Sequence, residues 1–293
     1  MSRLASVARR VRVWLPVGGL LVVTAVVSLG SASCGSAAGA AAGAFARVNG
    51  LRLYYQVHGT GGVPLVLLPG GGSTIESTYG EVLASLAERG RVIAIDEQNH
   101  GRSGHRAGPE RFTDSADDVA ELVRQLGHTQ VDVMGFSNGA TVALQVAIRH
   151  PSLVRKLVFA SGLAKRGGAA PEFWEFMERA TFDDMPQSLK DDFLAVNADR
   201  AQLRAMYDKD AHRMRTFADI PTAQIRAVRA QTLILGGDRD VPTLEHLHDL
   251  SRWIPRARLV VLPTGHGEYL GEQTAGSRFE SEVTVALVDW FLD

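Results

Sequence analysis

The chain has 293 residues, of which 45% are hydrophobic and 22% are charged, a balance that is ordinary for a soluble globular enzyme. Its formal charge of −1 gives no electrostatic reason to expect a nucleic acid or another polyanion as partner. The single cysteine, Cys34, excludes an intramolecular disulfide.

The N-terminal segment has the pattern of a targeting signal rather than of a folded domain. Residues 1–12 carry four arginines and no acid, and residues 13–29 form an apolar run that Pro16 and two glycines interrupt. This run is short for a membrane span, and small residues follow it, as in the cleavage zone of a bacterial export signal. We therefore expect a signal peptide at 1–33 and export across the bacterial cytoplasmic membrane.

Cys34 stands directly after this apolar run. The sequence Ala-Ser-Cys at 32–34 resembles a lipoprotein processing site, although Ser31 departs from the aliphatic residue that is usual there. The chain is then either a lipoprotein anchored to the membrane through a lipidated Cys34 or a soluble secreted or periplasmic protein. In both cases residues 34–44, which after the cysteine contain only Gly, Ala and Ser, predict a flexible tether.

Short apolar segments alternate with helical segments through most of the remaining chain. The turn Asn49-Gly50 predicts a β-hairpin over 45–57. Further strands are predicted at 64–68, 91–95, 131–135, 156–160, 232–235 and 259–262. Helical spacing predicts helices at 75–89, 115–126, 140–150 and 284–291. Because parallel strands need crossover helices, this pattern predicts an α/β fold with a mostly parallel sheet of about eight strands flanked by helices.

Residues 164–228 interrupt the alternation, since they contain no convincing strand and hold helical stretches rich in charge, Met, Phe and Trp. Such an insertion after the sixth strand predicts a helical cap over the carboxyl ends of the strands, where open α/β sheets bind ligands. The expected organisation is a core formed by 45–163 and 229–293, with the cap at 164–228.

The pentapeptide Gly-Phe-Ser-Asn-Gly at 135–139 follows a predicted buried strand and precedes a predicted helix. A strand, a sharp turn of small residues and a helix form the setting in which a serine is exposed as a nucleophile. The glycines are needed because the turn is strained and backbone comes close to it. The pentapeptide alone is a weak signal, so its context has to support the interpretation.

That context consists of further motifs along the chain. They are Leu-Leu-Pro-Gly-Gly-Gly at 67–72, Asp-Glu-Gln-Asn-His-Gly-Arg-Ser at 96–103, Gly-Asp-Arg-Asp at 237–240 and Gly-His-Gly at 265–267. Together with the pentapeptide they resemble the α/β-hydrolase family over roughly residues 45–293, and the order Ser, Asp, His along the chain is the family's order.

The resemblance implies a catalytic triad with Ser137 as nucleophile and His266 as base. A serine hydroxyl needs an adjacent base, and the histidine needs an acid that orients it and stabilises its protonated form. Two acids compete for this role. Asp240 matches the family's register, with two residues between it and the glycine of the motif, and Asp238 is the alternative.

The resemblance also implies an oxyanion hole formed by the backbone N–H groups of Asn138 and Gly71. The segment at 67–72, which we call the glycine loop, departs from the family pattern, because Pro69 stands where a histidine is usual. His100 is expected to support the neighbouring loop through hydrogen bonds.

No cofactor or metal is implied. No Gly-Lys-Ser/Thr follows the glycines at 70–72, which excludes a P-loop. His246 and His248 are two residues apart on a predicted helix, so they point to different faces and are interpreted as surface histidines rather than as metal ligands.

Three functions are considered. The first is a carboxylesterase-like serine hydrolase that cleaves a small-molecule ester through an acyl-enzyme. The second uses the same triad for C–C bond hydrolysis or for cofactor-free perhydrolysis, since fold and triad do not fix the substrate. The third is a non-catalytic exported binding protein. Oligomeric state and acyl preference are not encoded in any recognisable pattern.

Overall fold

The computed structural model describes residues 43–275 and 281–293. The expected signal peptide at 1–33, Cys34 and the tether up to residue 42 lie outside the described residues. Of the helices in the described ranges, none combines the length and the hydropathy that a membrane span requires.

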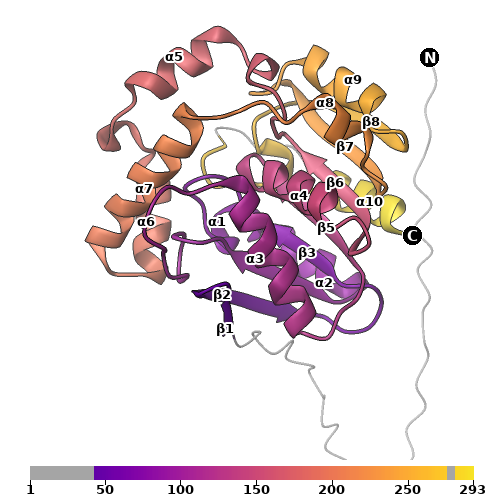
Figure 1. Ribbon diagram of the computed structural model, residues 1–293, viewed down its shortest axis with the longest axis horizontal. Coiled ribbons are helices and arrows are strands. Elements are labelled where there is room, and N and C mark those ends of the chain that lie inside the picture. The colour runs from indigo at the N-terminus through magenta and orange to yellow at the C-terminus, as the bar shows by residue number, and fades with distance from the viewer. Residues whose placement is uncertain (1–42, 276–280) are drawn as a thin grey trace, which may run out of the picture. The chain divides into compact units, whose positions relative to one another are not determined.

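An eight-stranded sheet forms the centre of the fold, with the strand order β1-β2-β4-β3-β5-β6-β7-β8 (Figure 1). The strands are β1 (Ala44–Val48), β2 (Leu51–His58), β3 (Leu65–Leu68), β4 (Val92–Asp96), β5 (Val131–Phe136), β6 (Val154–Ala160), β7 (Gln231–Arg239) and β8 (Ala257–Gly265). Strand β2 pairs antiparallel with β1 and β4, and the other neighbouring strands pair in parallel. The prediction of a mostly parallel sheet of about eight strands is confirmed.

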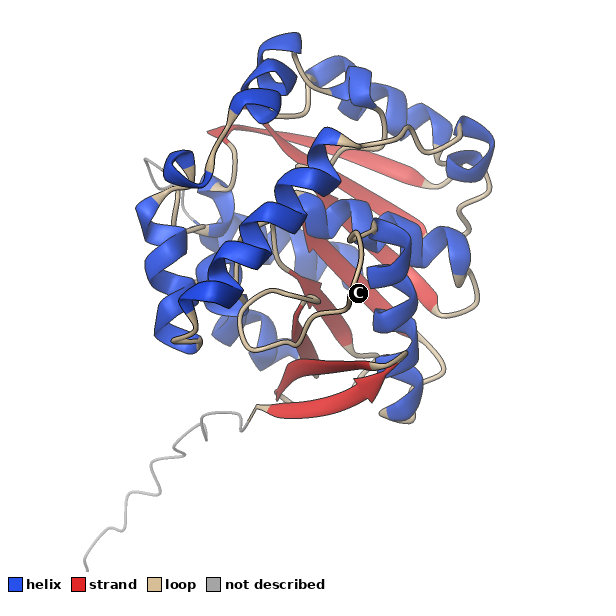
Figure 2. Cartoon of the chain, turned by 60° about the vertical axis from the view of Figure 1, so that its left-hand side comes forward, coloured by secondary structure: helices blue, strands red, loops and turns tan. Residues whose placement is uncertain are grey.

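Helices cover both faces of the sheet (Figure 2). They are α1 (Ile75–Tyr79), α2 (Leu83–Arg89), α3 (Phe112–Gln125), α4 (Asn138–Arg149), α5 (Pro171–Arg179), α6 (Gln187–Val196), α7 (Arg200–Arg215), α8 (Thr222–Arg226), α9 (Leu244–Trp253) and α10 (Ser281–Leu292). Apolar side chains of α3, α4, α8 and α9 pack on one face, and those of α1, α2 and α10 pack on the other. Burial on both faces explains why the central strands are apolar throughout.

The single helix predicted at 75–89 is in fact two helices. Helix α1 begins after Thr74, whose side chain accepts from the Ser77 N–H, and it ends at Gly80. Helix α2 then begins after Val82. Periodicity alone concealed the break, although glycine has a poor propensity for helix interiors.

The segment between β6 and β7 contains α5, α6, α7 and α8 and no strand. Figure 1 shows α5, α6 and α7 together beside the sheet. Side chains of Asn197 and Gln202 donate to the carbonyls of Gly101 and Ser103, and the Asn99 amide donates to the Ala205 carbonyl. The helices are thus fastened to the loop that follows the carboxyl end of β4.

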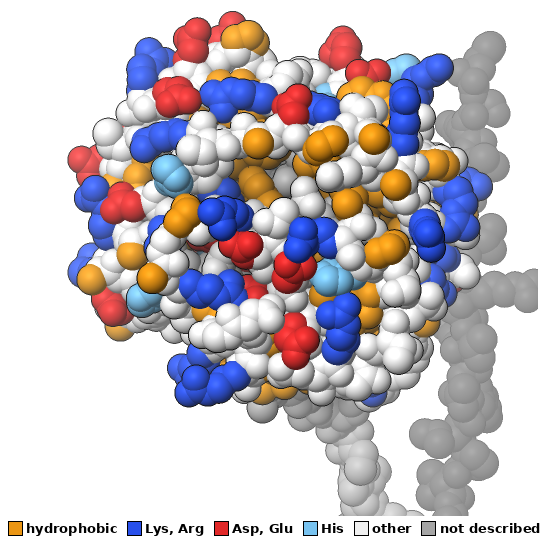
Figure 3. Space-filling view, in the orientation of Figure 1, with side chains coloured by type: hydrophobic (Ala, Val, Ile, Leu, Met, Phe, Trp, Pro, Cys, Tyr) orange, Lys and Arg blue, Asp and Glu red, His pale blue; other side chains and the backbone are white. Residues whose placement is uncertain are grey.

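On the face shown in Figure 3, Lys and Arg side chains are interspersed with Asp and Glu side chains. No extended area of one sign is visible on this face, in keeping with the balanced charge of the sequence.

We expect Leu157→Ala to lower the free energy of unfolding by about 2 to 5 kcal/mol, because Leu157 on β6 is fully buried and its truncation leaves a cavity. Urea denaturation followed by circular dichroism measures this loss. Leu244→Ala, at an exposed position of α9, is the matched control and should change stability by less than about 0.5 kcal/mol. Equal losses in both variants would contradict the described core.

Candidate active site

The sharp turn between β5 and α4 holds Ser137 in a strained backbone conformation, with φ 53° and ψ −119°. Positive φ is rare for a residue with a side chain and persists only where the surroundings enforce it. A Cβ on Gly135 would stand 2.1 Å from the Gly139 carbonyl oxygen, and one on Gly139 would stand 2.2 Å from that of Leu68. Both glycines are therefore required by close backbone packing, as the pentapeptide suggested.

The structure brings Ser137, His266 and Asp240 together. The Ser137 hydroxyl lies 3.1 Å from His266 Nε2, and His266 Nδ1 lies 2.6 Å from Asp240 Oδ1. The three residues follow the carboxyl ends of β5, β7 and β8, and the register between β7 and β8 shifts between Gly237 and Arg239, just before Asp240. Such irregularities commonly re-aim side chains beside functional sites.

The competing acid, Asp238, does not reach the histidine. Its side chain is 46% exposed, and its one recorded ion pair is with Arg239. Asp240, in contrast, is completely buried and bonded to His266. Of the two acids, Asp240 is therefore the one that lies at the histidine.

Asp240 is held by a set of donors that the sequence analysis did not identify. Its Oδ2 accepts from the Gly237 N–H at 2.9 Å and from the Ser161 hydroxyl, and its Oδ1 accepts from the Val241 N–H at 2.7 Å. The Ser161 oxygen lies 2.5 Å from the Tyr269 hydroxyl. Because Ser161 donates to the carboxylate, Tyr269 must be the donor to Ser161.

These donors determine the charge of Asp240. Burial raises the pKa of Asp240, but the hydrogen bonds from His266, Gly237 and Ser161 and the charge of His266 outweigh burial, and the pKa lies below its ordinary value. Burial, together with the Asp240 charge, raises the pKa of Tyr269 well above 10, so this hydroxyl stays protonated and can donate. A polar residue at the end of an apolar strand, as Ser161 is after β6, was the sequence signal for this contact.

The N–H groups of Gly71 and Asn138 have no hydrogen-bond acceptor within residues 43–275 and 281–293. Asn138 begins α4, so its N–H is one of the groups at a helix start that the helix itself leaves unsatisfied. The Asn138 N–H belongs to the sharp turn at 135–139 and the Gly71 N–H to the glycine loop, and the two segments are packed together where Gly139 meets the Leu68 carbonyl.

His100 is buried beneath the glycine loop. Its Nε2 accepts from the Gly72 N–H at 3.0 Å, and its Nδ1 lies 2.9 Å from the Gln98 carbonyl oxygen. Because the amide can only donate, Nε2 is unprotonated and Nδ1 carries the proton. The supporting role expected for this residue corresponds to these two bonds.

A buried cluster of charged side chains joins α7 to the turn at 135–139, and the sequence analysis did not identify it. Asp210 on α7 accepts from the Asn138 side-chain amide at 3.2 Å and from the Arg213 guanidinium at 2.5 Å. Arg213 also bonds to Glu110 at 3.1 Å and to Glu97 at 3.4 Å. The sequence signal for this cluster was the spacing of Asp210 and Arg213, three residues apart on a helix whose other inward residues are apolar.

A cavity of about 210 Å³ adjoins the glycine loop. Its lining is mostly apolar and comes from the loop and from the segment between β6 and β7; it includes Gly71, Gly72, Met177, Met185, Leu189, Met206, Tyr207 and Asp210. Mostly apolar walls with a few polar groups are typical of small-molecule sites. We call this space the loop cavity.

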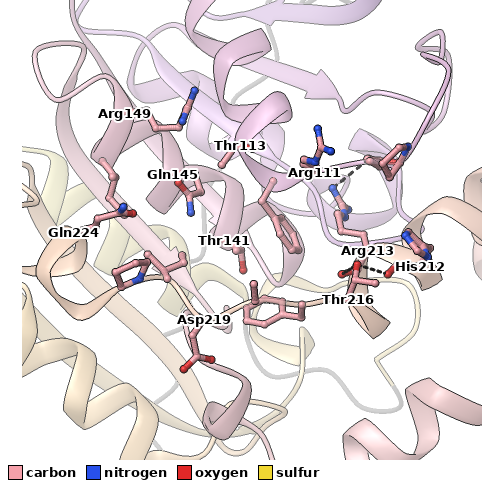
Figure 4. A pocket seen from close by; sticks show the side chains of 18 of the residues that line it. Arg111, Thr113, Thr141, Gln145, Arg149, His212, Arg213, Thr216, Asp219 and Gln224 are labelled. Atoms are coloured by element: carbon pink, nitrogen blue, oxygen red, sulfur yellow. Dashed lines mark hydrogen bonds and ion pairs between the residues drawn. The ribbon is translucent and has the colours of Figure 1, made fainter.

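A second and larger hollow of about 840 Å³ shares no lining residue with the loop cavity (Figure 4). It is lined by the start of α3, by Thr141 and Gln145 of α4, and by the end of α7 with the chain that follows. Ser137, His266 and Asp240 line neither this hollow nor the loop cavity, but Gly71 lines the loop cavity and does not line the larger hollow.

His246 is not the surface histidine that its spacing from His248 suggested. It is buried, and its Nε2 accepts from the Ala164 N–H at 3.1 Å. Burial lowers the pKa of His246 to about 4, which keeps the ring neutral for this structural bond. Within the described part of the chain, no group of His, Cys, Asp or Glu side chains is arranged to hold a metal ion.

Comparison with known proteins identifies the family. Residues 63–207 match the alpha/beta hydrolase fold. The chain is 30% identical over 229 residues to the 2-hydroxymuconate semialdehyde hydrolase of Pseudomonas sp. (strain CF600), covering 70% of this chain and 81% of the relative. It is 26% identical to the human serine hydrolase BPHL, covering 74% and 77%. The chain belongs to the α/β-hydrolase family.

Solved structures agree with this fold. A serine hydrolase involved in carbazole degradation superposes with a TM-score of 0.71 at 21% identity, covering 86% of this chain and 99% of its own. A thermophilic esterase from Thermogutta terrifontis superposes with a TM-score of 0.66 at 23% identity, covering 85% and 98%. Within the family the protein is thus a hydrolase, which is the coarse level at which the sequence-based assignment is confirmed.

We expect the stability contributed by Asp240 to depend on pH. Its folded pKa lies below the unfolded value of about 3.9, so the contribution is complete above about pH 5 and is lost as pH falls through the folded pKa. The difference in unfolding free energy between wild type and Asp240→Asn should therefore shrink in acid, as urea titrations from about pH 7 down to about pH 3 would reveal.

Asp238→Asn is the matched control, two residues away and solvent-exposed, and should stay within about 0.5 kcal/mol of wild type throughout. A difference for Asp240→Asn that persists unchanged in acid would contradict the described environment of this carboxylate.

Proposed function

We propose that the protein is a serine hydrolase that cleaves carboxylic esters through an acyl-enzyme. The observation that carries the proposal is the hydrogen-bonded line from Ser137 through His266 to the buried Asp240, set at a strained turn. These are the parts that a serine needs to act as a nucleophile at neutral pH.

In the first half-reaction, the Ser137 oxygen attacks the ester carbonyl carbon while its proton passes to His266 Nε2. The resulting imidazolium faces the ionised Asp240, whose bonds to Gly237, Val241 and Ser161 keep it in place. His266 then gives this proton to the leaving alcohol, and the acyl group remains on the serine.

The negative oxygen of the tetrahedral intermediate is received by the N–H groups of Asn138 and Gly71. Both are without an acceptor in the described residues, and loss of one such donor typically costs about 3 kcal/mol of transition-state stabilisation. In the second half-reaction, water attacks the acyl carbon and His266 removes its proton; His266 then returns the proton to the Ser137 oxygen as the bond from the acyl carbon to that oxygen breaks, and the acid is released.

Ester hydrolysis is favoured over the cleavage reactions of two named relatives by the charge of the loop cavity. The names 2-hydroxymuconate semialdehyde hydrolase and 2-(acetamidomethylene)succinate hydrolase describe enzymes for substrates that bear carboxylates. The charged residues lining the loop cavity of this chain are Asp184 and Asp210, with no Lys or Arg. An anionic substrate would be repelled there.

We expect Ser137→Ala to reduce kcat for p-nitrophenyl butyrate by about 10⁴-fold or more, since the nucleophile is removed. Asp240→Asn should also lose about 10⁴-fold, because the histidine then takes the wrong tautomer. Asp238→Asn is the matched control and should retain wild-type kcat. Release of p-nitrophenol and labelling of Ser137 by a fluorophosphonate probe are the two measurements.

The alternatives predict other results. A non-catalytic binding protein leaves Ser137 unlabelled, and wild-type rates in Ser137→Ala would refute the proposal outright. A C–C hydrolase or a perhydrolase keeps the labelling but turns over the ester slowly relative to a ring-cleavage dienoate or to hydrogen peroxide with an acid.

We also propose, from the sequence of residues 1–44, that the protein is exported and anchored through a lipidated Cys34. Palmitate labelling in a bacterial host should mark the wild-type chain and should be absent from Cys34→Ala. Ser33→Ala, next to the cysteine, is a control that should keep the label, since a small residue remains there. An unlabelled wild-type chain recovered from the medium or the periplasm would replace this proposal with the soluble secreted form.

A further inference from the structure

The loop cavity adjoins Gly71, whose N–H is proposed to receive the carbonyl oxygen of the ester. The leaving alcohol must come within reach of His266 Nε2, which protonates it, while the carbonyl oxygen faces Gly71 and Asn138. The cavity is lined by Gly71 and Gly72, and neither Ser137 nor His266 lines it, so it lies beyond the proposed carbonyl site and away from the histidine. The acyl group is therefore the part of the substrate that this cavity can receive.

One atom in this mostly apolar lining stands out. Asp210 Oδ1 accepts from Asn138 and from Arg213, but Oδ2 accepts no hydrogen bond from any residue in the described ranges. His100 Nε2 lies 4.0 Å from Oδ2 but does not donate to it, since this nitrogen accepts from the Gly72 N–H. The Asp210 side chain is 13% exposed and lines the cavity.

The other acid of the cavity does not share this property. Asp184 Oδ2 accepts from both the backbone N–H and the hydroxyl of Thr181, in a capping arrangement within one turn. By contrast, the Tyr207 hydroxyl, which belongs to another residue of the lining, is buried without a partner in the described residues. Two polar groups of α7 are thus left unsatisfied beside an otherwise apolar space.

Asp210 is ionised in this setting. Burial raises the pKa of Asp210, but the charge of the Arg213 guanidinium and the hydrogen bonds from Arg213 and Asn138 oppose burial, and the pKa lies below its ordinary value. Oδ2 is open to the cavity, so an acyl group that fills the cavity covers this oxygen; covering it without supplying a donor is costly, and a donor on the ligand removes that cost.

Resting on the proposed ester hydrolysis, we propose that Asp210 determines acyl specificity and selects esters whose acyl group carries a hydroxyl or ammonium close to the carbonyl. The donor on the substrate bonds to Oδ2. A neutral, purely aliphatic acyl group leaves this oxygen unsatisfied, and a carboxylate on the acyl group is repelled by it.

The position of Oδ2 fixes where the donor must stand. A Cβ on Gly71 would lie 2.5 Å from Oδ2, so the oxygen stands against the residue whose N–H faces the substrate carbonyl. The donor therefore belongs on the second or third carbon of the acyl chain. An apolar cavity of about 150 Å³ is enough for benzene, so about 210 Å³ suits a short acyl chain.

The test uses ethyl esters of matched shape, with acid release followed in a pH-stat at neutral pH. Ethyl 3-hydroxybutyrate and ethyl 3-aminobutyrate differ from ethyl 3-methylbutyrate only in the group on the third carbon, and monoethyl succinate places a carboxylate there. We expect kcat/KM to be about 10-fold or more higher for the hydroxy and amino esters than for the methyl ester, and lowest for the succinate.

Asp210→Asn removes the charge and keeps the shape. Arg213 retains Glu97 and Glu110 as partners, so the cluster stays compensated. In this variant the preference for the amino ester should fall to about 2-fold or less, and the rate with monoethyl succinate should rise. Asp208→Asn, an exposed position on the same helix, is the matched control and should keep the wild-type ratios.

The outcomes separate this proposal from the one it rests on. Loss of all ester hydrolysis in Ser137→Ala, with equal wild-type rates for the hydroxy, amino and methyl esters, overturns only the role of Asp210. Preferences that persist in Asp210→Asn overturn it as well. Hydrolysis that does not depend on Ser137 overturns the proposed function itself. If Asp210→Asn fails to fold, as judged by circular dichroism, the wild-type series alone decides.

Discussion

The arrangement of the site depends on one backbone constraint, the positive φ of Ser137 at the junction of β5 and α4. This conformation holds because surrounding backbone leaves no alternative: the Ser137 N–H donates to the Ala160 carbonyl at 2.9 Å, and Gly139 lies under the carbonyls of Leu68 and Pro69. The turn, the end of β6 and the start of the glycine loop are therefore packed as one piece. The N–H groups of Asn138 and Gly71 owe their common location to that packing.

Around this turn, two buried carboxylates, Asp240 and Asp210, have different surroundings. Asp240 is surrounded by donors that keep it ionised opposite His266, and Tyr269 supports one of them through Ser161. Asp210 is compensated by Arg213, which is itself shared with Glu97 and Glu110. In the proposed mechanism an uncompensated acid next to the developing oxyanion would oppose the reaction, and Arg213 compensates the charge of Asp210.

Most of the core was predictable because its signals are local. Apolar runs bounded by Gly and Pro marked the strands, and the residues just after β5, β7 and β8 marked the constellation, since parallel strands end at one edge. Sequence signals failed where contacts between residues far apart in the chain determine the structure. Gly80 broke an expected helix, His246 is buried by the chain around Ala164, and Ser161 and Tyr269 meet across 108 residues. The Asp210 contact with Asn138 spans 72 residues and has no local signature.

The bond from Asn138 to Asp210 limits which segments between β6 and β7 can be exchanged among related enzymes. The Asn138 side chain is tied to the α7 helix while its backbone N–H belongs to the turn beside Ser137. Under the roles proposed for Asp210 and Asn138, substrate choice and catalytic rate are therefore linked. An exchange of the helical segment for that of a relative, made to acquire a new substrate, would remove the partner of Asn138 and loosen the turn. Successful exchanges must carry an acceptor at position 210 or replace residue 138 at the same time.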